Sequence, residues 1–552
     1  NDSNTSDNSD YFFSSTNSLL SLDSWNWKHL KNSQVFMLKA AIIVGSGGFI
    51  YGYDIGIISG TLIQLQRRFS LSSIEQGLVV SLLPLGSIFG CLFGGPLCDY
   101  IGRWQTIIIQ NLIYIGGALI IAGANNIETV YVGRFVVGIG TALSGIADIP
   151  YLTEISPPQY RGRLASAYEF LAVVGIFASF LVNLMVSQKE GSWRMLFALP
   201  SIFAFIQGIL MIYLPDSPKW LIQNGYYDQG RFALRQALDS EDEVTQKFNE
   251  IKSSNENSLS NSLQQQALKE CLYRYRWMFV CIFILMFFQQ FTGGVVVRNY
   301  ATSIFHSAGL GDQAALTFTV IVGFIKVLTV GWSILNLDGL GRKYLLLVGI
   351  CIQASGHFIL ALAFTISGNL NVVVYVIGSS LILGGFSLGL GPITWLLQSE
   401  IFPTLIRGRA MGFSVIMRNL GEFAINFTFL TLVQTIGNDG VFFMFFILCL
   451  LALLFIYFFF VETKEKEPDE ILSEFEINFL KLFTKKSSGS YLCVNDDSVH
   501  DTTSNQSIPI TTSTLAPIPT IGRGKRKGKG KEKENEKGLG SIEVNPLNQQ
   551  EK

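Results

Sequence analysis

Charged residues are scarce in this sequence of 552 residues, where Asp, Glu, Lys and Arg together make up 15%. Soluble domains usually carry about a quarter. With 49% hydrophobic residues and a mean hydropathy of +0.38, the composition excludes a string of ordinary soluble domains. The 40 basic residues are balanced by 41 acidic ones, so no excess of positive charge indicates a nucleic-acid partner. The composition favours a membrane protein.

Cysteine and histidine are scarce as well. Most of the 7 cysteines lie inside apolar stretches, which argues against a disulfide framework. The four histidines (His29, His306, His357 and His500) are scattered, and no spacing typical of a metal site occurs. No nucleophile–base set and no phosphate-binding glycine loop is found either. We therefore expect no enzyme, no cofactor and no bound metal. The N-terminal segment also lacks the order of a cleaved signal peptide.

In place of charge, the sequence has apolar stretches of about 20 residues, the length that crosses a bilayer. Each must be helical, because lipid offers backbone amides no hydrogen-bond partner. We predict an all-α membrane protein with twelve transmembrane helices, at Phe36–Thr61, Gly77–Cys98, Gln105–Gly123, Val130–Pro150, Leu164–Ser187, Trp193–Leu214, Trp277–Ser303, Ala314–Leu337, Tyr344–Ile366, Val372–Gln398, Ala410–Val433 and Val441–Val461.

A polar interval divides these spans into two sets of six. We expect a polar N-terminal segment at 1–35, a first half at 36–214, a linker at 215–276, a second half at 277–461 and a tail at 462–552. Within the linker, Gln229–Leu238 and Glu243–Ile251 are patterned as short amphipathic helices. The tail is largely disordered by composition, and its Lys/Gly run at Arg523–Lys533 is either simply solvated or weakly attracted to an anionic leaflet.

Basic residues are distributed unevenly between the loops. One set of short loops carries most of them, namely Arg103, Arg161, Arg163, Arg342, Lys343, Arg407 and Arg409. The opposite set carries fewer, namely Arg67, Arg68, Lys189 and, at loop edges, Arg194 and Arg298. The positive-inside rule then places the first set, the linker and both termini in the cytoplasm.

Two charge motifs occur in both halves. Asp99 and Asp338 stand four positions before Arg103 and Arg342, and Glu154 and Glu400 stand seven positions before Arg161 and Arg407. Repeats in the same order imply two pseudo-symmetric halves related by an axis along the membrane normal. This organisation is typical of a carrier whose binding site lies between its halves.

Several ordered motifs resemble those of the sugar-porter family of the major facilitator superfamily, over nearly all of Phe36–Ile471. They are Gly48–Asp54 (G-x-x-x-G-Y-D), Gly95–Arg103 (G-x-L-x-D-Y-x-G-R), Pro215–Leu221 (P-D-S-P-K-W-L), Gln289–Gly293 (Q-Q-x-x-G), Gly391–Arg407 (beginning G-P-x-x-W) and Val461–Lys464 (V-E-T-K). Tyr100 and Val461 depart from the family pattern. The resemblance implies the major facilitator fold, with two six-helix halves.

A charge inside a span is costly and needs a partner or a function. The resemblance implies that Asp54 and Arg134 face each other and couple proton binding to sugar binding. A permanent structural ion pair is the alternative, and some family members with this Asp are uniporters. At the span ends, the resemblance implies salt bridges that close one side of the carrier, formed by Asp99, Arg103, Glu154, Arg161, Asp338, Arg342, Glu400 and Arg407. Gly391-Pro392 predicts a bend in the tenth span that serves gating.

The binding site retains only part of the family pattern. Gln289, Gln290 and Trp395 match sugar-binding positions, whereas amide or aromatic positions of the family are occupied here by Glu169, Asn299, Lys326, Arg418, Asn419 and Glu422. Arg418 and Glu422 are four apart and suit an ion pair on one helix face. Lys326 and Glu169 either pair across the halves or belong to a pocket altered for an acidic or amino sugar, an inositol, another polyol or an unrelated polar solute.

The sequence thus predicts a carrier of a sugar or related polyol that works by alternating access and is coupled to protons. A facilitative uniporter and a sensor that signals through its tail are the alternatives. The expected partners are a small polar solute, protons and the lipid bilayer. The plasma membrane is the default location for this family, with endosomal or vacuolar membranes as alternatives.

Overall fold

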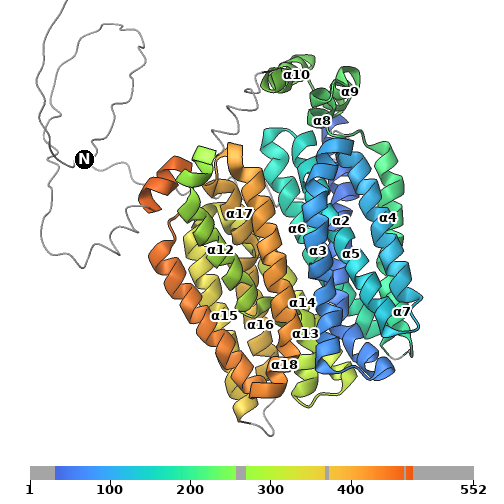
Figure 1. Cartoon of the computed structure of the whole chain (residues 1–552), viewed down its shortest axis with the longest axis vertical. Coiled ribbons are helices and arrows are strands. Elements are labelled where there is room, and N and C mark those ends of the chain that lie inside the picture. The colour runs from blue at the N-terminus through green and yellow to red at the C-terminus, as the bar shows by residue number, and fades with distance from the viewer. Residues whose placement is uncertain are drawn as a thin grey trace, which may run out of the picture. The chain divides into compact units, whose positions relative to one another are not determined.

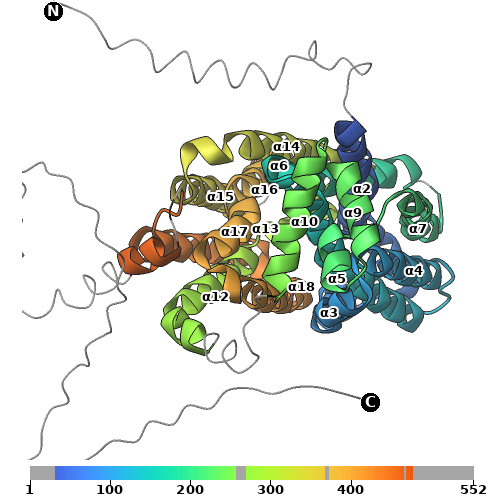
Figure 2. The ribbon, with the colours of Figure 1, turned by 90° about the horizontal axis from the view of Figure 1, so that it is seen from above.

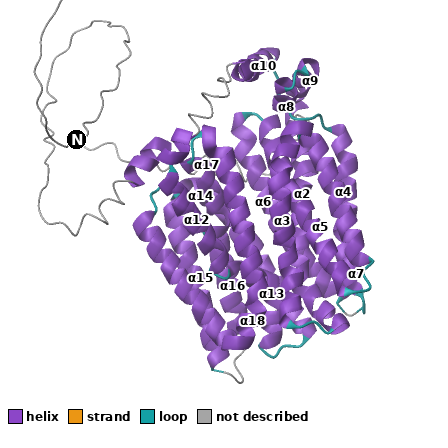
Figure 3. Cartoon of the chain, viewed as in Figure 1, coloured by secondary structure: helices purple, strands orange, loops and turns teal. Residues whose placement is uncertain are grey.

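The computed structural model describes residues 32–187, 189–256, 269–366, 372–464, 466 and 468–475. In these ranges the regular structure is helical and no strand occurs, as Figure 3 shows. The predictions for residues 1–31, for the Lys/Gly run and for the rest of the tail lie outside the described residues.

Both halves are built of long helices, and the second half also contains broken ones (Figure 1). The first half contains α2 (Asn32–Phe69), α3 (Ser73–Ile101), α4 (Arg103–Ala122), α5 (Ile127–Ile155), α6 (Pro158–Val186), α7 (Ser192–Leu210) and the 3-10 turn η3 (Met211–Tyr213). Three short helices follow: α8 (Pro218–Gln223), α9 (Tyr227–Ala237) and α10 (Glu241–Glu256). The second half contains α12 (Arg276–Phe291), α13 (Gly294–Ser307), α14 (Asp312–Leu340), α15 (Arg342–Thr365), α16 (Val372–Leu388), α17 (Leu390–Ile401) and α18 (Thr404–Phe459).

Eleven helices of the described part are long and apolar enough to cross a membrane. The last of them covers Leu405–Phe459, which is twice the length that one span needs. Gly437, with φ of 77°, interrupts its helical geometry, so this segment supplies the eleventh and twelfth predicted spans. The prediction of an all-α membrane protein is confirmed.

The helices α8, α9 and α10 lie together at one end of the bundle (Figure 1), which we call the linker end. The opposite end, where α2 passes into α3 and α13 into α14, is called the far end. Seen along the bundle in Figure 2, the two halves lie side by side. Helix α3 packs against α18, and α6 against α14, across the boundary between them.

Contacts across this boundary join the halves at the far end. Arg67, near the end of α2, forms an ion pair with Asp312 at the start of α14. About two turns deeper along α2, the hydroxyls of Ser59 and Thr302 lie 3.1 Å apart. The α3 residue Gly77 leaves no room for a side chain, because a Cβ there would lie 2.5 Å from the carbonyl oxygen of Phe427. The halves are therefore closely packed at the far end.

The seventh and tenth spans are each broken near their middle. Between α12 and α13 the chain turns at Gly293, whose φ of 83° suits glycine. The freed carbonyl of Thr292 accepts hydrogen bonds from Gln353 Nε2 and His357 Nε2, both at 2.8 Å. The break thus occurs without an unsatisfied carbonyl at this position.

The break in the tenth span is centred on Gly389, between α16 and α17. Pro392 has no backbone N–H, so the carbonyl of Leu388 loses its helical donor four residues on. Ser333 Oγ donates to that carbonyl instead, at 3.4 Å. The predicted bend at Gly391-Pro392 is present, and its centre lies slightly earlier because the proline acts on the preceding turn.

Candidate functional site

A fully buried ion pair lies in the middle of the first half. Arg134 NH1 of α5 donates to Asp54 Oδ2 of α2 over 3.0 Å, and the two residues are 1% and 2% exposed. Arg134 Nε also donates to the carbonyl of Val79 at 3.3 Å. Its guanidinium carbon lies 5.7 Å from the centre of the Phe197 ring. The predicted pairing of Asp54 with Arg134 is therefore formed, and the arginine keeps two other contacts if the carboxylate leaves it.

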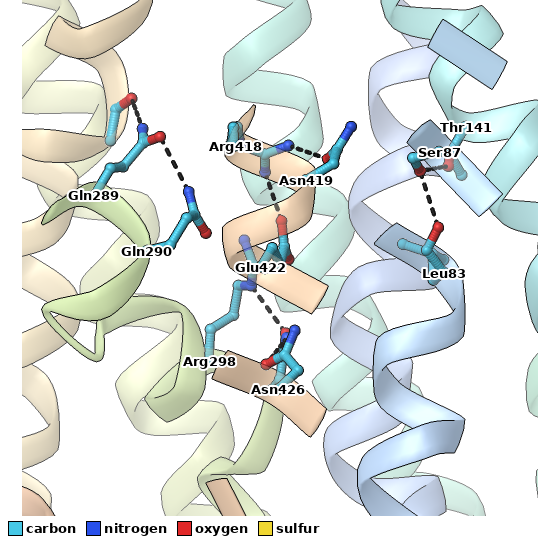
Figure 4. Close-up of polar contacts among 12 residues, drawn as sticks. Leu83, Ser87, Thr141, Gln289, Gln290, Arg298, Arg418, Asn419, Glu422 and Asn426 are labelled. Atoms are coloured by element: carbon cyan, nitrogen blue, oxygen red, sulfur yellow. Dashed lines mark hydrogen bonds and ion pairs between the residues drawn. The ribbon is translucent and has the colours of Figure 1, made fainter. Parts of the chain in front are cut away.

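A second group of buried charges lies in the other half, where Glu422 of α18 stands between two arginines (Figure 4). Arg298 NH2 of α13 donates to Glu422 Oε1 at 2.7 Å, and Arg418 NH2 lies 3.0 Å from Glu422 Oε2. We call these three residues the Glu422 cluster. The predicted pair of Arg418 with Glu422 is confirmed. The placement of Arg298 at a loop edge was wrong, because this residue lies inside α13 and is 6% exposed.

Asparagines extend the Glu422 cluster on both sides. Arg298 Nε donates to Asn299 Oδ1 at 3.0 Å, and Asn299 Nδ2 donates to Asn426 Oδ1 at 3.1 Å. Arg418 NH1 donates to Asn419 Oδ1 at 3.0 Å. Asn299 and Asn419 are therefore held by protein groups in this structure, and Asn426 is a member that the sequence did not single out.

Arg418 also reaches the boundary between the halves. Its NH2 lies 3.5 Å from the hydroxyl of Tyr51, on α2 of the first half. Its guanidinium carbon lies 5.6 Å from the centre of the Trp395 ring, which is half-buried on α17. Arg418 thus contacts both Trp395, the predicted aromatic residue of the site, and a hydroxyl of the other half.

Lys326 and Glu169 do not form an ion pair among the described residues. Lys326 of α14 is 5% exposed, with Nζ 5.9 Å from the centre of the Phe386 ring. Glu169 of α6 is exposed and interacts electrostatically with both Lys326 and Arg418. The two unpaired charges thus lie on opposite halves near one another, with the glutamate accessible to solvent.

The two glutamines of α12 have different surroundings. Gln289 Nε2 donates to the Leu390 carbonyl at 2.9 Å and to Thr394 Oγ1 at 2.6 Å, so it ties α12 to α17 just after the break. Gln290 Nε2 donates to Gln289 Oε1 at 3.1 Å (Figure 4). Gln290 Oε1 is buried and makes no hydrogen bond to the described protein. Gln290 therefore keeps a buried acceptor that no group of the described protein satisfies.

The charges at the linker end of the first half form a compact network. Arg103 contacts Glu154 at 3.0 Å and Asp99 at 3.3 Å, and Ser217 Oγ donates to Glu154 Oε2 at 2.6 Å. Asp216 Oδ1 accepts the backbone N–H groups of Arg103 and Trp104, which begin α4, both at 3.1 Å. Burial raises the pKa of Asp216, although these N–H donors act in the opposite direction.

The second half repeats the contacts made by Glu154, Asp216 and Ser217. Arg342 NH2 donates to Glu400 Oε1 at 2.8 Å, and Thr463 Oγ1 donates to Glu400 Oε2. Glu462 accepts the backbone N–H groups of Arg342 and Lys343, which begin α15, at 2.8 and 3.0 Å. Each of these two networks stays within its own half.

Two other predicted gating residues, Arg161 and Arg407, take no part in these ion pairs among the described residues. Arg161 Nε donates to the Ser156 carbonyl at 3.4 Å, and Arg407 Nε donates to the Phe402 carbonyl at 3.1 Å. The side chain of Asp338 lies outside the described part of the structure. Within the described residues, no group of three His, Cys, Asp or Glu side chains is placed to hold a metal ion.

Solved structures share this arrangement of helices. The partially occluded, inward-open xylose transporter XylE from E. coli superposes with a TM-score of 0.69 and 26% identity, over 78% of this chain and 99% of XylE. The proton:xylose symporter XylE bound to 6-bromo-6-deoxy-D-glucose gives a TM-score of 0.67 and 27% identity, over 80% and 99%. The predicted major facilitator fold is confirmed.

Sequence comparisons also identify sugar transporters as relatives. The glucose transporter GlcP of Staphylococcus epidermidis is 32% identical over 438 residues, covering 79% of this chain and 96% of GlcP. The arabinose-proton symporter of Bacillus subtilis is 29% identical over 452 residues, covering 80% and 95%. The family model described as sugar (and other) transporter matches residues 40–475. This chain is a transporter of the sugar-porter family of the major facilitator superfamily.

Proposed function

We propose that the chain is a proton-coupled symporter that carries a sugar or a related polyol across a membrane by alternating access. The observation that carries the proposal is the buried pair of Asp54 and Arg134, joined over 3.0 Å. A carboxylate enclosed with a guanidinium loses its partner when it binds a proton, and this change can bias a two-state carrier. The similarity to the B. subtilis arabinose-proton symporter and to the proton:xylose symporter XylE supports the proposal.

Protonation of Asp54 is the first step of the proposed mechanism. The neutral acid no longer attracts Arg134, whose guanidinium retains the Val79 carbonyl and the Phe197 ring. Because the pair joins α2 to α5, its loosening frees α2 to move relative to α5. Helix α2 also carries Tyr51, which contacts Arg418 of the other half. The proton-binding pair is therefore connected to the boundary between the halves through one helix.

Solute binding is proposed at this boundary. Trp395 offers an aromatic face for the apolar side of a sugar ring, and Gln290 Oε1 offers an acceptor for a hydroxyl. Glu169, exposed on the first half, and Lys326 and Arg418 on the second supply charged hydrogen-bonding groups on opposite sides. A polyhydroxylated solute can bridge them, because each hydroxyl both donates and accepts. An acidic or amino sugar is an alternative solute for the same charged groups.

The linker-end networks are proposed to gate the carrier. Arg103–Glu154 and Arg342–Glu400 stay within their halves here, whereas Arg67–Asp312 joins the halves at the far end. The likeness to the inward-open XylE structures fits a carrier closed at the far end. With the basic loops in the cytoplasm, the linker end faces inward and the far end outward. We place the protein in the plasma membrane, with both termini cytoplasmic.

The experiment uses purified protein in liposomes and a panel of hexoses, pentoses, inositol, uronic acids and amino sugars. With an acidic exterior, wild type should accumulate one of these solutes against its gradient. Asp54→Asn should abolish accumulation and retain counterflow exchange, because exchange needs no net proton movement. Asp228→Asn, a neutralised carboxylate on the exposed surface of α9, is the matched control and should accumulate solute like wild type.

Each alternative has its own outcome. Accumulation that is absent in wild type, with downhill uptake indifferent to pH and to an uncoupler, would indicate a uniporter and contradict symport. Binding of a panel solute without flux in either direction would indicate a sensor.

A further inference from the structure

A second buried carboxylate lies in the first half, outside the pair of Asp54 and Arg134. Asp148 belongs to α5 and has no solvent exposure. Helix α2 covers it at Gly47, where a Cβ would lie 2.0 Å from Asp148 Oδ2. The glycine is thus required for α2 to pack directly over the carboxylate. The proposed transport mechanism gives this acid no role.

All hydrogen-bond partners of Asp148 in the structure are uncharged. Gln110 Nε2 of α4 lies 3.2 and 3.3 Å from its two oxygens, and Ser144 Oγ, one turn earlier on α5, donates to Oδ2. Ser144 Oγ also lies 2.9 Å from the hydroxyl of Tyr168 on α6. No Lys or Arg of the described residues forms an ion pair with Asp148. This distinguishes it from Asp54, which has a guanidinium in contact.

The titratable groups that face this region come from three helices. They are the hydroxyls of Tyr51 on α2, Tyr114 on α4 and Tyr168 on α6, with the carboxylate of Glu169 beside Tyr168. None of these groups brings a positive charge, and Arg134, which acts on Tyr114 from α5, is paired with Asp54. An ionised carboxylate in apolar surroundings without a cation is strongly disfavoured, and its neutral, protonated form is favoured instead.

A small polar cavity adjoins Asp148. It has a volume of about 10 Å³, enough for one water molecule, and its polar lining comprises Tyr51, Gln110, Asn111, Tyr114, Thr141, Ser144 and Gln207. Four buried atoms of this lining, Gln110 Oε1, Asn111 Nδ2, Gln207 Oε1 and the Tyr114 hydroxyl, make no hydrogen bond to the described protein. Buried polar atoms of this kind are normally satisfied by water. The cavity is therefore suited to an ordered water that contacts both amides and hydroxyls.

The same cavity extends toward Asp54. Tyr114 lines it, and the Tyr114 hydroxyl interacts electrostatically with the Asp54 carboxylate. Gln110 and Ser144 line it as well, and both donate to Asp148. Polar groups thus continue from one buried acid to the other through α4 and α5, with room for a single water between them.

We propose that Asp148 is a second proton-binding site of the carrier, hydrated through this cavity and connected by it to Asp54. In this arrangement Asp148 holds a proton inside the first half, and the water and hydroxyls offer it a route to and from the coupling pair. The ligand is a proton, delivered as part of a water-mediated hydrogen-bond path. Proton binding at Asp148 stands whether or not Asp54 couples transport.

Infrared difference spectroscopy tests the proposal without any solute. Purified protein in lipid is titrated from about pH 5 to about pH 9, a range in which buried carboxyls can exchange protons. The stretching band of a protonated carboxyl group is followed in wild type, Asp148→Asn, Asp54→Asn and the surface control Asp228→Asn. The difference between wild type and Asp148→Asn should contain one protonated-carboxyl band that is retained in Asp54→Asn and in the control.

Ser144→Ala provides a second variant that keeps the carboxyl group. It removes a hydrogen-bond donor to the carboxyl group, so both the titration midpoint and the frequency of the Asp148 band should change. The proposal would be overturned if Asp148→Asn gave the same spectrum as wild type, in protein that reconstitutes into lipid and has the wild-type thermal midpoint. It would also be overturned by a Ser144→Ala band with unchanged frequency and midpoint. If Asp148→Asn fails to fold, Ser144→Ala carries the test alone.

These outcomes separate the proposal from the proposed transport function. A titrating Asp148 band in a protein whose uptake ignores the proton gradient would reject symport and keep the second site. Proton-driven accumulation without an Asp148 band would support symport and reject the second proton-binding site.

Discussion

The Glu422 cluster shows how strongly single residues depend on partners far away in the sequence. Glu422 accepts from Arg298, 124 positions earlier, and from Arg418 on its own helix. All three side chains are at most 13% exposed. Removing one member of such a buried set leaves charge without compensation, which costs more than the pair itself contributes.

Glu422→Gln should therefore lower the free energy of unfolding by about 3–5 kcal/mol, because two arginines lose their carboxylate in the interior. The loss is measured as a fall in the thermal midpoint of purified protein in detergent. Arg298→Met combined with Glu422→Leu should recover much of it, since fewer uncompensated charges remain buried. A Glu422→Gln protein as stable as wild type would contradict the structural role given to the cluster.

Sequence and structure agree best on residues whose partners have a fixed spacing or a family position. Arg418 and Glu422 are four apart on a helix, so their pairing could be predicted from the sequence. The contact of Asp54 with Arg134 followed from the family resemblance. Arg298 and Asp148 were missed as site residues, because a charge inside an apolar stretch gives no sign of which distant helix will face it.

At the scale of elements, the broken seventh and tenth spans bring backbone and glutamine groups to the middle of the second half. The proline in Gly391-Pro392 predicted the tenth-span bend through a lost donor. No proline lies at the break in the seventh span. The break depends on Gly293 and on two side chains that donate hydrogen bonds to the Thr292 carbonyl. That break depends on tertiary partners, so the sequence pattern of one span did not predict it.

Gly293→Ala tests this account of the seventh span. The backbone there has a φ of 83°, and a Cβ would lie 2.7 Å from the Phe445 ring and 2.9 Å from His357. The left-handed backbone conformation is strained for alanine, and the added Cβ overpacks the site. Together we expect these effects to lower the free energy of unfolding by roughly 2–4 kcal/mol.

Gly309→Ala is the matched control, since φ is 88° and no atom lies within 4 Å of the added Cβ. It should cost only the conformational strain, about 1–2 kcal/mol. Equal thermal midpoints for the two variants would show that packing at Gly293 adds nothing.

At the scale of the whole molecule, the two halves have matching parts and different tasks. The linker-end networks are repeated, with Asp216 and Ser217 corresponding to Glu462 and Thr463 in what they contact. The buried acids Asp54 and Asp148 belong to the first half, whereas the buried acid of the second half, Glu422, is paired with Arg298 and Arg418. We infer that proton binding is concentrated in the first half and solute recognition largely in the second.

The duplicated motifs and the twelve apolar stretches were enough to predict the helical fold and its two halves. The sequence did not indicate which end of the bundle is closed, because that depends on contacts such as Arg67 with Asp312 between distant helices. Nor did it indicate that Lys326 and Glu169 remain apart in this conformation. Both features depend on the relative position of the halves, which changes during a transport cycle.

The central claim, coupling of solute entry to proton entry, is tested most directly by measuring both fluxes in the same liposomes. A pH-sensitive dye is trapped inside, and the solute found in the panel is added outside without an imposed pH gradient. We predict that the lumen acidifies as the solute enters through wild-type protein, and that Asp54→Asn shows no acidification under the same conditions. Solute entry through wild type with no change in luminal pH would contradict the account.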